Sequence, residues 1–419
     1  MQFELCVLSN GIEKKLLFDN VSNSFVDLES KAQLLSTTKV LGYKKHQDQF
    51  NINFSDIGVL FINLGLRCNF SCKYCHQNNF RKSTKVCDFT PTKVEGFLNI
   101  LKRSKVKMKA IAFWGGEPLV YWKTLKVLIP KVRELYPSVI INFPTNGSLL
   151  TREIINFLEL YNIGFYISYD GKKTNRDVSI FDDEKLIEAI RNMNKGLSIM
   201  PTQNRASIPI KQIKDEFKDY KIKLSSISPY SIARCNPYNR EQADEILIPF
   251  EKCCEHSEFI YDVLHSNVSD IKLYRGLLDR FNFILGIYYR GLGVDSVDVN
   301  FCCNSIGKDI CIDCTGNIFN CMNIPLHIVG NLLDFSSFNS QSIFKNHLYK
   351  NKCLACPYVS CCRGGCPLIH DDESIEFKVN CNNLKIIAVP FFRTMVERLL
   401  GVYLKRITRY EDQQLIAEF

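Results

Sequence analysis

Short apolar runs alternate with amphipathic stretches between residues 57 and 230, and this alternation constrains the fold more than any other feature of the chain. The apolar runs have the length of buried strands, and the stretches between them have the length of helices of about 10–15 residues. Such a pattern is typical of βαβ units, whose strands are parallel and whose crossovers are right-handed. It predicts an α/β fold in which about six repeats form a partial (β/α)6 TIM-like barrel.

The 419-residue chain contains 19 cysteines, an odd number that cannot all pair as disulfides. The first residues lack the apolar core of a signal peptide, so we expect a cytoplasmic protein in which dense cysteines are more often metal ligands than bridges. No apolar run approaches the roughly 18 residues of a membrane span, and no membrane association is expected. The net charge of +9 is spread along the chain, which favours a solvated surface over a nucleic-acid site.

The pattern changes along the chain, and the changes divide it into consecutive regions. Asn10-Gly11 joins two strand-like runs and predicts a β-hairpin. The cysteine-rich region near the C-terminus has little apolar periodicity, so metal ligation is its expected source of stability. We expect a hairpin region at 1–55, the partial barrel at 56–235, a helical linker at 236–300, a cysteine-rich Fe-S domain at 301–383 and a C-terminal helix at 384–419.

A short cysteine motif follows the first predicted barrel strand. Cys68, Cys72 and Cys75 are separated by three and by two residues, in a loop at the carboxyl end of the strand, where barrel active sites are built. Three thiolates on so short a loop can bind three irons of a 4Fe-4S cube and leave the fourth iron open to a substrate. A zinc knuckle with His76 as its fourth ligand is the alternative.

The motif resembles that of the radical S-adenosylmethionine (radical SAM) family, in which an aromatic residue, here Tyr74, precedes the last cysteine. The resemblance implies that Cys68, Cys72 and Cys75 are catalytic as well as metal-binding, and that the open iron binds S-adenosyl-L-methionine. It also implies that an electron, from a donor such as flavodoxin or ferredoxin, cleaves this cofactor to methionine and a 5′-deoxyadenosyl radical. That radical would then remove hydrogen from the substrate.

Further matches to the family follow the next strands. Gly115, Gly116, Glu117 and Pro118 resemble the loop that receives the methionine amino group. Two glycines allow close backbone approach, and a carboxylate is a charge-assisted acceptor for an ammonium group. The resemblance implies that the cofactor-binding residues are Tyr74, Gly115, Gly116, Glu117, Pro118, Asn146, Ser168, Asp170 and Arg176.

Among the later cysteines, 12 residues separate Cys303 from Gly316 and four more precede Cys321, and gaps of two, five, three and 14 residues separate Cys353, Cys356, Cys362, Cys366 and Cys381. These spacings resemble those of the SPASM extension found in peptide- and protein-modifying radical SAM enzymes. This resemblance implies two auxiliary clusters and therefore three 4Fe-4S clusters in all. Its outer cluster would be held by Cys353, Cys356, Cys362 and Cys381, and its inner cluster by Cys303, Cys321 and Cys366. The fourth ligand of the inner cluster would be Cys302, Cys311 or Cys314, or that iron would be open. Two zinc ribbons are the alternative for this region.

The resemblance implies an oxidoreductase that acts on a ribosomally made precursor peptide with a leader. We expect an intramolecular cross-link, an ether or carbon-carbon macrocycle of the darobactin or cyclophane type on an aromatic side chain. A peptide epimerase and a thioether-forming maturase remain alternatives. A formylglycine-generating sulfatase maturase is disfavoured, because those enzymes carry a catalytic aspartate where this chain has Met322, whose thioether cannot accept a proton. A zinc-bearing nucleic-acid-binding module is the alternative outside enzymes.

Overall fold

The computed structural model describes all residues except 21, 23, 36–55, 82–86, 173, 175, 177–179, 290–308, 320, 324, 326, 335–350, 363, 367, 368 and 370; the side chains of 287–289, 351 and 360 are also not described. The chain forms two compact units. Unit 1 comprises Met1–Gln47, Pro249–Phe301 and Lys345–Phe419, and unit 2 comprises Asp48–Ile248 and Cys302–Phe344. The units therefore divide the cysteine-rich region between residues 344 and 345.

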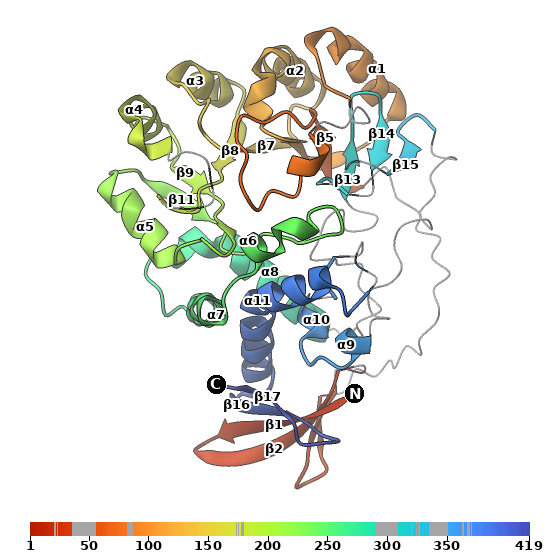
Figure 1. Ribbon diagram of the computed structural model, residues 1–419, viewed down its shortest axis with the longest axis vertical. Helices are drawn as coiled ribbons and strands as arrows, with labels where there is room; N and C mark the ends of the chain where they lie inside the picture. The colour runs from red at the N-terminus through yellow and green to blue at the C-terminus, as the bar shows by residue number, and fades with distance from the viewer. Residues whose placement is uncertain are drawn as a thin grey trace. The chain divides into compact units, whose positions relative to one another are not determined.

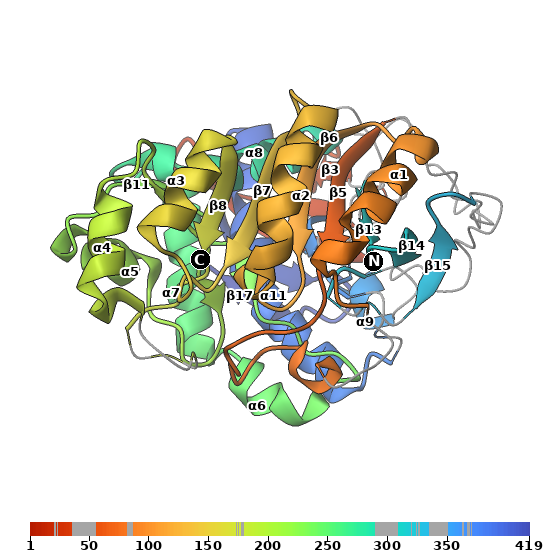
Figure 2. The ribbon, with the colours of Figure 1, turned by 90° about the horizontal axis from the view of Figure 1, so that it is seen from above.

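Unit 2 contains the predicted row of parallel strands. Neighbouring strands pair in parallel in the order β11-β9-β8-β7-β6-β5. These strands are β5 (Ile57–Asn63), β6 (Met108–Trp114), β7 (Ile140–Thr145), β8 (Ile163–Ile167), β9 (Leu197–Ile199) and β11 (Leu224–Ile227). Helices α1 (Val94–Ser104), α2 (Trp122–Leu135), α3 (Arg152–Leu160), α4 (Glu184–Arg191) and α5 (Ile210–Asp219) connect them and lie along one side of the row (Figures 1 and 2). The predicted α/β fold is confirmed.

Local sequence explains where these helices begin and which face they bury. The hydroxyl of Thr151 accepts a hydrogen bond from the Ile154 N–H at 3.2 Å and caps α3. Helix α1 buries its apolar stripe, including Phe97 and Leu101, and ends at Lys105 in the left-handed conformation. These helices are thus amphipathic, as their sequence periodicity predicts.

Three more strands extend this sheet beyond β5. Strand β13 (Asp309–Ile312) pairs in parallel with β5, and the antiparallel strands β14 (Asn317–Phe319) and β15 (Ile328–Asn331) follow. The Asp313 carboxylate accepts hydrogen bonds from the N–H groups of Thr315 and Asn317 at 2.8 and 3.1 Å, which fixes the turn between β13 and β14. Part of the cysteine-rich region is therefore held by ordinary strand pairing, which its sequence does not predict.

Shorter elements complete unit 2. Strands β10 (Thr202–Gln203) and β12 (Ser231–Ile232) pair in parallel as a separate two-stranded sheet. The other short elements are α6 (Ala243–Ile246) and the 3-10 helices η1 (Asn78–Phe80), η2 (Pro91–Lys93), η3 (Pro118–Tyr121), η4 (Ile180–Asp182) and η5 (Arg240–Gln242).

Unit 1 is built on a six-stranded antiparallel sheet that joins the two ends of the chain. Its order is β17-β16-β1-β2-β3-β4, and the hairpin predicted at Asn10-Gly11 connects β1 to β2. The strands are β1 (Gln2–Ser9), β2 (Ile12–Asp19), β3 (Ser24–Asp27), β4 (Gln33–Leu35), β16 (Tyr403–Arg409) and β17 (Leu415–Glu418). Figure 1 shows the termini at this sheet, with β1 beside β16.

The prediction of a helix over residues 384–419 is wrong for residues 401–419. Helix α11 (Ile375–Leu400) ends where Gly401 takes a left-handed conformation, with φ of 66°, and donates its N–H to the Glu397 carbonyl at 2.9 Å. The chain then forms β16 and β17. β16 is stabilised by its pairing with β1, almost four hundred residues away in the sequence, so no local pattern marks it.

The helices of unit 1 pack through aromatic side chains. Phe392 of α11 contacts Phe18 of β2 with ring centroids 5.1 Å apart, and Phe391 contacts Phe281 of α8 at 5.3 Å. Burying such side chains stabilises each by roughly 1.5–3 kcal/mol. The other helices of this unit are α7 (Phe250–Leu264), η6 (Ile271–Tyr274), α8 (Arg275–Tyr289), α9 (Asn351–Leu354) and α10 (Val359–Cys362).

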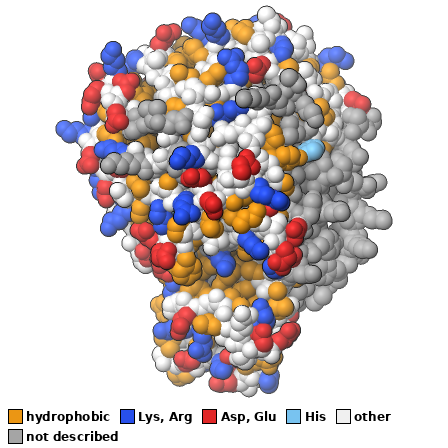
Figure 3. All heavy atoms as spheres, in the orientation of Figure 1, with side chains coloured by type: hydrophobic (Ala, Val, Ile, Leu, Met, Phe, Trp, Pro, Cys, Tyr) orange, Lys and Arg blue, Asp and Glu red, His pale blue; other side chains and the backbone are white. Residues whose placement is uncertain are grey.

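Two observations concern the surface and membrane association. On the face drawn in Figure 3, Lys and Arg side chains are interspersed with Asp and Glu side chains. Within the described residues, no helix combines the length and the apolar character needed to cross a bilayer.

A buried histidine on α7 makes the stability of unit 1 sensitive to acid. Burial lowers the pKa of His256 from 6.5 to about 4. Between these values the unfolded chain binds the proton and the folded chain does not, so stability falls as the pH falls from 6.5 to 4. We expect the variant His256→Gln to lose less stability over this interval than the wild type, by up to about 3 kcal/mol. Urea denaturation followed by circular dichroism at pH 7 and pH 5 measures this, and equal losses in both proteins would contradict it.

Candidate active site

The carboxyl ends of β5, β6, β7 and β8 surround a cavity of about 140 Å³ in unit 2. Its lining combines three thiols with charged, amide and hydroxyl groups. The lining residues are Cys68, Phe70, Cys72, Tyr74, Cys75, Gln77, Arg81, Gly116, Glu117, Pro144, Thr145, Asn146, Ser168 and Arg176. The structure therefore brings together most of the residues that the sequence motifs single out.

The cysteine loop is shaped by its own hydrogen bonds. The Cys75 N–H donates to the Cys72 carbonyl at 3.0 Å, and the Asn78 side-chain amide donates to the same carbonyl at 2.9 Å. The Phe70 N–H lies 3.4 Å from the Cys68 sulfur. Cys68, Cys72 and Cys75 thereby all line one cavity.

The chemistry of this donor set fits an iron-sulfur cube. Burial raises the pKa of the Cys68 thiol and raises that of Cys72 to about 12, so a bound metal must displace these protons. Among the described side chains, no three His, Cys, Asp or Glu groups converge as a single metal ion requires. A cube does not require such convergence, because each thiolate binds a different iron.

Arg81 is a cavity residue that the sequence motifs did not identify. Its guanidinium donates to the Phe70 carbonyl and lies 4.0 Å from the Cys75 sulfur, while its buried Nε has no partner among the described residues. A fixed positive charge so close to thiolates stabilises their negative charge. An arginine six residues after a cysteine is a common pattern, so the sequence alone does not single out Arg81.

Two glycines allow the second strand end to approach the cysteine loop. The Gly116 and Glu117 N–H groups donate to the carbonyls of Gly65 and Arg67 at 3.0 and 2.9 Å. A Cβ atom on Gly116 would lie 2.3 Å from the Arg67 carbonyl oxygen, and one on Gly115 would lie 2.2 Å from that of Gly65. No larger residue fits this backbone contact, so the glycine requirement applies to the loop itself as well as to a ligand.

The Glu117 carboxylate is buried where three strand ends meet. It accepts hydrogen bonds from the Thr145 hydroxyl at 2.8 Å, the Leu119 N–H at 3.0 Å and the Asn146 N–H at 2.6 Å. Burial raises the pKa of Glu117, and the two backbone N–H groups oppose that shift. A carboxylate has about four acceptor positions, so three occupied positions leave one for an ammonium group in the cavity.

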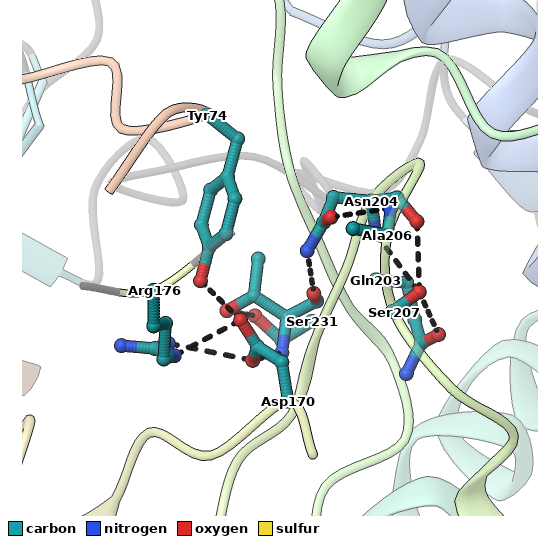
Figure 4. A network of polar contacts seen from close by, with 9 residues as sticks. Tyr74, Asp170, Arg176, Gln203, Asn204, Ala206, Ser207 and Ser231 are labelled. Carbon is teal, nitrogen blue, oxygen red and sulfur yellow. Dashed lines mark hydrogen bonds and ion pairs between the residues drawn. The ribbon is translucent and has the colours of Figure 1, made fainter. Parts of the chain in front are cut away.

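Asp170 joins the cysteine loop to the segment after β8. The Tyr74 hydroxyl donates to it, the Arg176 guanidinium forms an ion pair with it at 2.9 Å, and the Thr202 N–H donates to it at 2.7 Å. Figure 4 shows Tyr74 and Arg176 both pointing toward Asp170. Arg176 therefore lies at the cavity wall with its charge paired inside the protein.

The remaining predicted cofactor residues occupy different positions. Asn146 donates from its side-chain amide to the Asn69 side-chain oxygen at 2.9 Å, and Ser168 also lines the cavity. Gly115, Pro118 and Asp170 are not among the residues that line the cavity, and Asp170 contacts two that are, Tyr74 and Arg176.

Five of the later cysteines line a second cavity, of about 40 Å³, within unit 1. They are Cys353, Cys356, Cys362, Cys366 and Cys381. The Asn20 side chain donates to the carbonyls of Leu354 and Cys356, both at 2.9 Å, and so fixes the loop between α9 and α10. Cys366, which the spacing assigns to the inner cluster, thus lies with the four thiols assigned to the outer one.

The other cysteines considered for the inner cluster are distributed in unit 2 or lie outside the described residues. Cys302 and Cys303 are outside them. Burial raises the pKa of Cys311, and neighbouring Cys321 adds to the shift, so these two thiols are close enough to interact. The Cys314 sulfur instead lies 3.5 Å from the Cys87 sulfur.

The packing of Gly116 generates a direct prediction. We expect Gly116→Ala to displace the cysteine loop, because the new Cβ would overlap the Arg67 carbonyl. The affinity for S-adenosyl-L-methionine should fall by about tenfold or more, since overlaps of this kind cost more than about 1.4 kcal/mol, and the iron bound after anaerobic reconstitution should fall by the share of one cluster. Gly96→Ala is the matched control, because no described atom beyond its chain neighbours and the backbone of its own helix lies within 4 Å of a Cβ at that position. Equal iron content in the two variants would contradict the prediction.

Two characterised proteins are similar in sequence to most of this chain. The radical SAM cyclopropyl synthase TigE of Paramaledivibacter caminithermalis is 24% identical over 402 residues, which cover 89% of this chain and 80% of that protein. The cysteine-type anaerobic sulfatase-maturating enzyme of Clostridium perfringens is 22% identical over 375 residues, covering 80% of this chain and 95% of that protein.

A solved structure gives the fold independently. Native anSMEcpe with bound AdoMet and Cp18Cys peptide superposes with a TM-score of 0.57 at 17% identity, covering 82% of this chain and 98% of that one. Residues 62–220, which include the cysteine loop and the glycine loop, match the model of the radical SAM superfamily. Residues 62–220 therefore form a radical SAM domain, and this superfamily implies an enzyme that uses S-adenosyl-L-methionine with a 4Fe-4S cluster.

Proposed function

We propose that this enzyme is a peptide maturase, which uses the cavity at the strand ends to form an intramolecular cross-link in a ribosomally made precursor peptide. The observation that carries the proposal is the presence of three loop thiols in one cavity with Glu117 and Asn146. When bound, the cluster and S-adenosyl-L-methionine supply a radical that removes hydrogen from an unactivated carbon. The protein's part is to hold these groups, orient the peptide and exclude water.

Cys68, Cys72 and Cys75 would hold the cluster and leave one iron without a protein ligand. The free acceptor position of Glu117 suits the methionine ammonium group, and Asn146 and Ser168 offer neutral polar groups beside it. Asp170 and Arg176 would keep Tyr74, and with it the loop, in place.

A larger cavity supports an extended polar substrate. It has a volume of about 660 Å³ and lies in unit 2, along β7, β8, β9 and β11. Tyr166 pairs with Ser198, and Ser198 pairs with Ser226, so side chains of these residues share one face of the sheet. Hydroxyl and amide groups in a row can bond to the backbone of a peptide. The structure of anSMEcpe with its bound peptide supports the same class of substrate.

Cross-linking is favoured over formylglycine formation by the residues after Cys321. Met322 has no group that accepts a proton, and the Asn323 side-chain oxygen accepts a hydrogen bond from the Trp114 indole at 3.2 Å. Neither residue provides a carboxylate base. The 24% identity to a cyclopropyl synthase also supports a ring-forming reaction. Formylglycine formation remains the second candidate, because a sulfatase-maturating enzyme matches 80% of this chain.

The cysteine cavity of unit 1 supports an auxiliary cluster, which would accept the electron that cross-linking releases. A second auxiliary cluster is proposed from the spacing of Cys303 and Cys321. A flavodoxin or ferredoxin is the proposed source of the initiating electron. The edge strands of unit 1, β4 and β17, offer places where an extended leader would add a strand.

Co-expression with a short open reading frame beside the gene, followed by mass spectrometry of the peptide, tests the proposed reaction. A cross-link removes two hydrogens and gives a product that does not react with hydroxylamine. Formylglycine is an aldehyde and does react, whereas epimerisation leaves the mass unchanged. An unmodified peptide, or stoichiometric zinc in place of iron, would overturn the proposal. The Cys68→Ala/Cys72→Ala/Cys75→Ala variant is the control and should form no 5′-deoxyadenosine.

The charge of Arg81 predicts a property of the cluster that is independent of the substrate. A positive charge near Cys75 favours the reduced cluster, so Arg81→Gln should lower its midpoint potential, on the order of 60 mV for about 1.4 kcal/mol. Potentiometric titration followed by electron paramagnetic resonance measures this. Arg81→Lys is the control, because it keeps the positive charge at the same position. A potential unchanged in Arg81→Gln, or lowered equally in both variants, would exclude the charge effect.

A further inference from the structure

Two cysteines outside the cavity lining meet beside a lysine at the edge of the radical SAM domain. The sulfur atoms of Cys87 and Cys314 lie 3.5 Å apart. The Lys93 ammonium group lies 2.8 Å from the Cys87 sulfur and 2.8 Å from the Asp88 carbonyl oxygen. The spacing pattern assigns Cys87 to no cluster and makes Cys314 one of three candidates for a cluster ligand.

Strand pairing, rather than chance proximity, brings the two thiols together. β13 pairs in parallel with β5, so Cys314, two residues after β13, lies at the same end of the sheet as the end of β5. The segment containing Cys87 is fixed at that end, because the Phe89 N–H donates to the Leu64 carbonyl at 2.9 Å. The pair is therefore held on two supported segments of one unit.

We propose that Cys87 and Cys314 form a redox modification site, in which a low-molecular-weight disulfide such as glutathione disulfide converts the two thiols into a reversible disulfide. A bond length of about 2.05 Å is reached from the present 3.5 Å by a modest approach of the two side chains. Neither thiol lines the cavity that contains Cys68, Cys72 and Cys75, so the reaction does not require a cluster ligand.

The chemistry has a defined order. Cys87 is half-buried and Cys314 is buried, so the small disulfide reaches Cys87 first. Cys87, whose sulfur lies 2.8 Å from the Lys93 ammonium group, attacks one sulfur of the small disulfide, whose S–S bond breaks to release one small thiol. Cys314 then attacks the Cys87 sulfur and releases the second small thiol. Two protein thiols are oxidised, one small disulfide is reduced to two thiols, and the two protein protons end on those products.

The location connects this site to the cysteine loop. Next to Cys87, the Asp88 carboxylate accepts a hydrogen bond from the Tyr121 hydroxyl at 2.8 Å. That hydroxyl in turn accepts one from the Arg67 N–H at 3.0 Å, directly before Cys68. A disulfide at Cys87 would therefore act on a segment that supports the loop.

The test uses the anaerobically purified holoenzyme treated with glutathione disulfide, quenched by alkylation and mapped by mass spectrometry. We expect a Cys87–Cys314 cross-linked peptide that dithiothreitol releases. Cys314→Ser should accumulate glutathione on Cys87, because the second step is then missing. Lys93→Gln should slow the reaction several-fold, with Lys102→Gln, an exposed position on α1, as the control.

Other outcomes would overturn the proposal. Glutathione that stays on wild-type Cys87, or that reacts only with exposed Cys254, would show that Cys314 does not resolve the mixed disulfide. Iron content should be the same in wild type, Cys87→Ser and Cys314→Ser. Loss of iron from Cys314→Ser alone would identify Cys314 as a cluster ligand, and zinc bound tightly to the pair would identify a metal site instead.

Discussion

The buried Glu117 carboxylate is the interaction on which the geometry of the site depends. It receives hydrogen bonds from the end of β7, through Thr145 and Asn146, and from the start of η3, through Leu119. The backbone N–H of Glu117 donates a hydrogen bond to the carbonyl of Arg67, the residue directly before Cys68. A buried carboxylate is costly unless donors surround it, so these segments must converge for the charge to be tolerated. The side chain and the backbone N–H of this one residue together align the glycine loop and the end of β7 with the cysteine loop.

Two arginines place positive charge close to the cysteine loop. Arg81 lies beside Cys75, and Asp170, paired with Arg176, accepts the hydrogen bond of the Tyr74 hydroxyl. The Asp88–Tyr121–Arg67 chain of hydrogen bonds supports the loop from the side of Cys87. The cysteine loop is consequently held by side chains from several strand ends, which is the kind of support that a reactive site requires.

Sequence patterns predicted the parts of the structure that contiguous residues determine. The six strands, the hairpin at Asn10-Gly11 and the convergence of Cys68, Gly116 and Glu117 follow from local periodicity and short motifs. The pairing of β13 with β5 and of β16 with β1 could not be predicted in this way, because partners far apart in the sequence stabilise these short strands. No sequence motif identifies Arg81, because its position beside Cys75 depends on the folded conformation of the loop.

The central claim is that the loop of Cys68, Cys72 and Cys75 binds a cluster with one iron open to S-adenosyl-L-methionine. The most direct test is the electron paramagnetic resonance spectrum of the reduced enzyme with and without this cofactor, because a new ligand at an iron changes the spectrum of the cluster. The account predicts a spectrum that changes on cofactor addition, and loss of that component in Cys72→Ala. A spectrum that the cofactor leaves unaltered, or a responsive component that survives in Cys72→Ala, would contradict it.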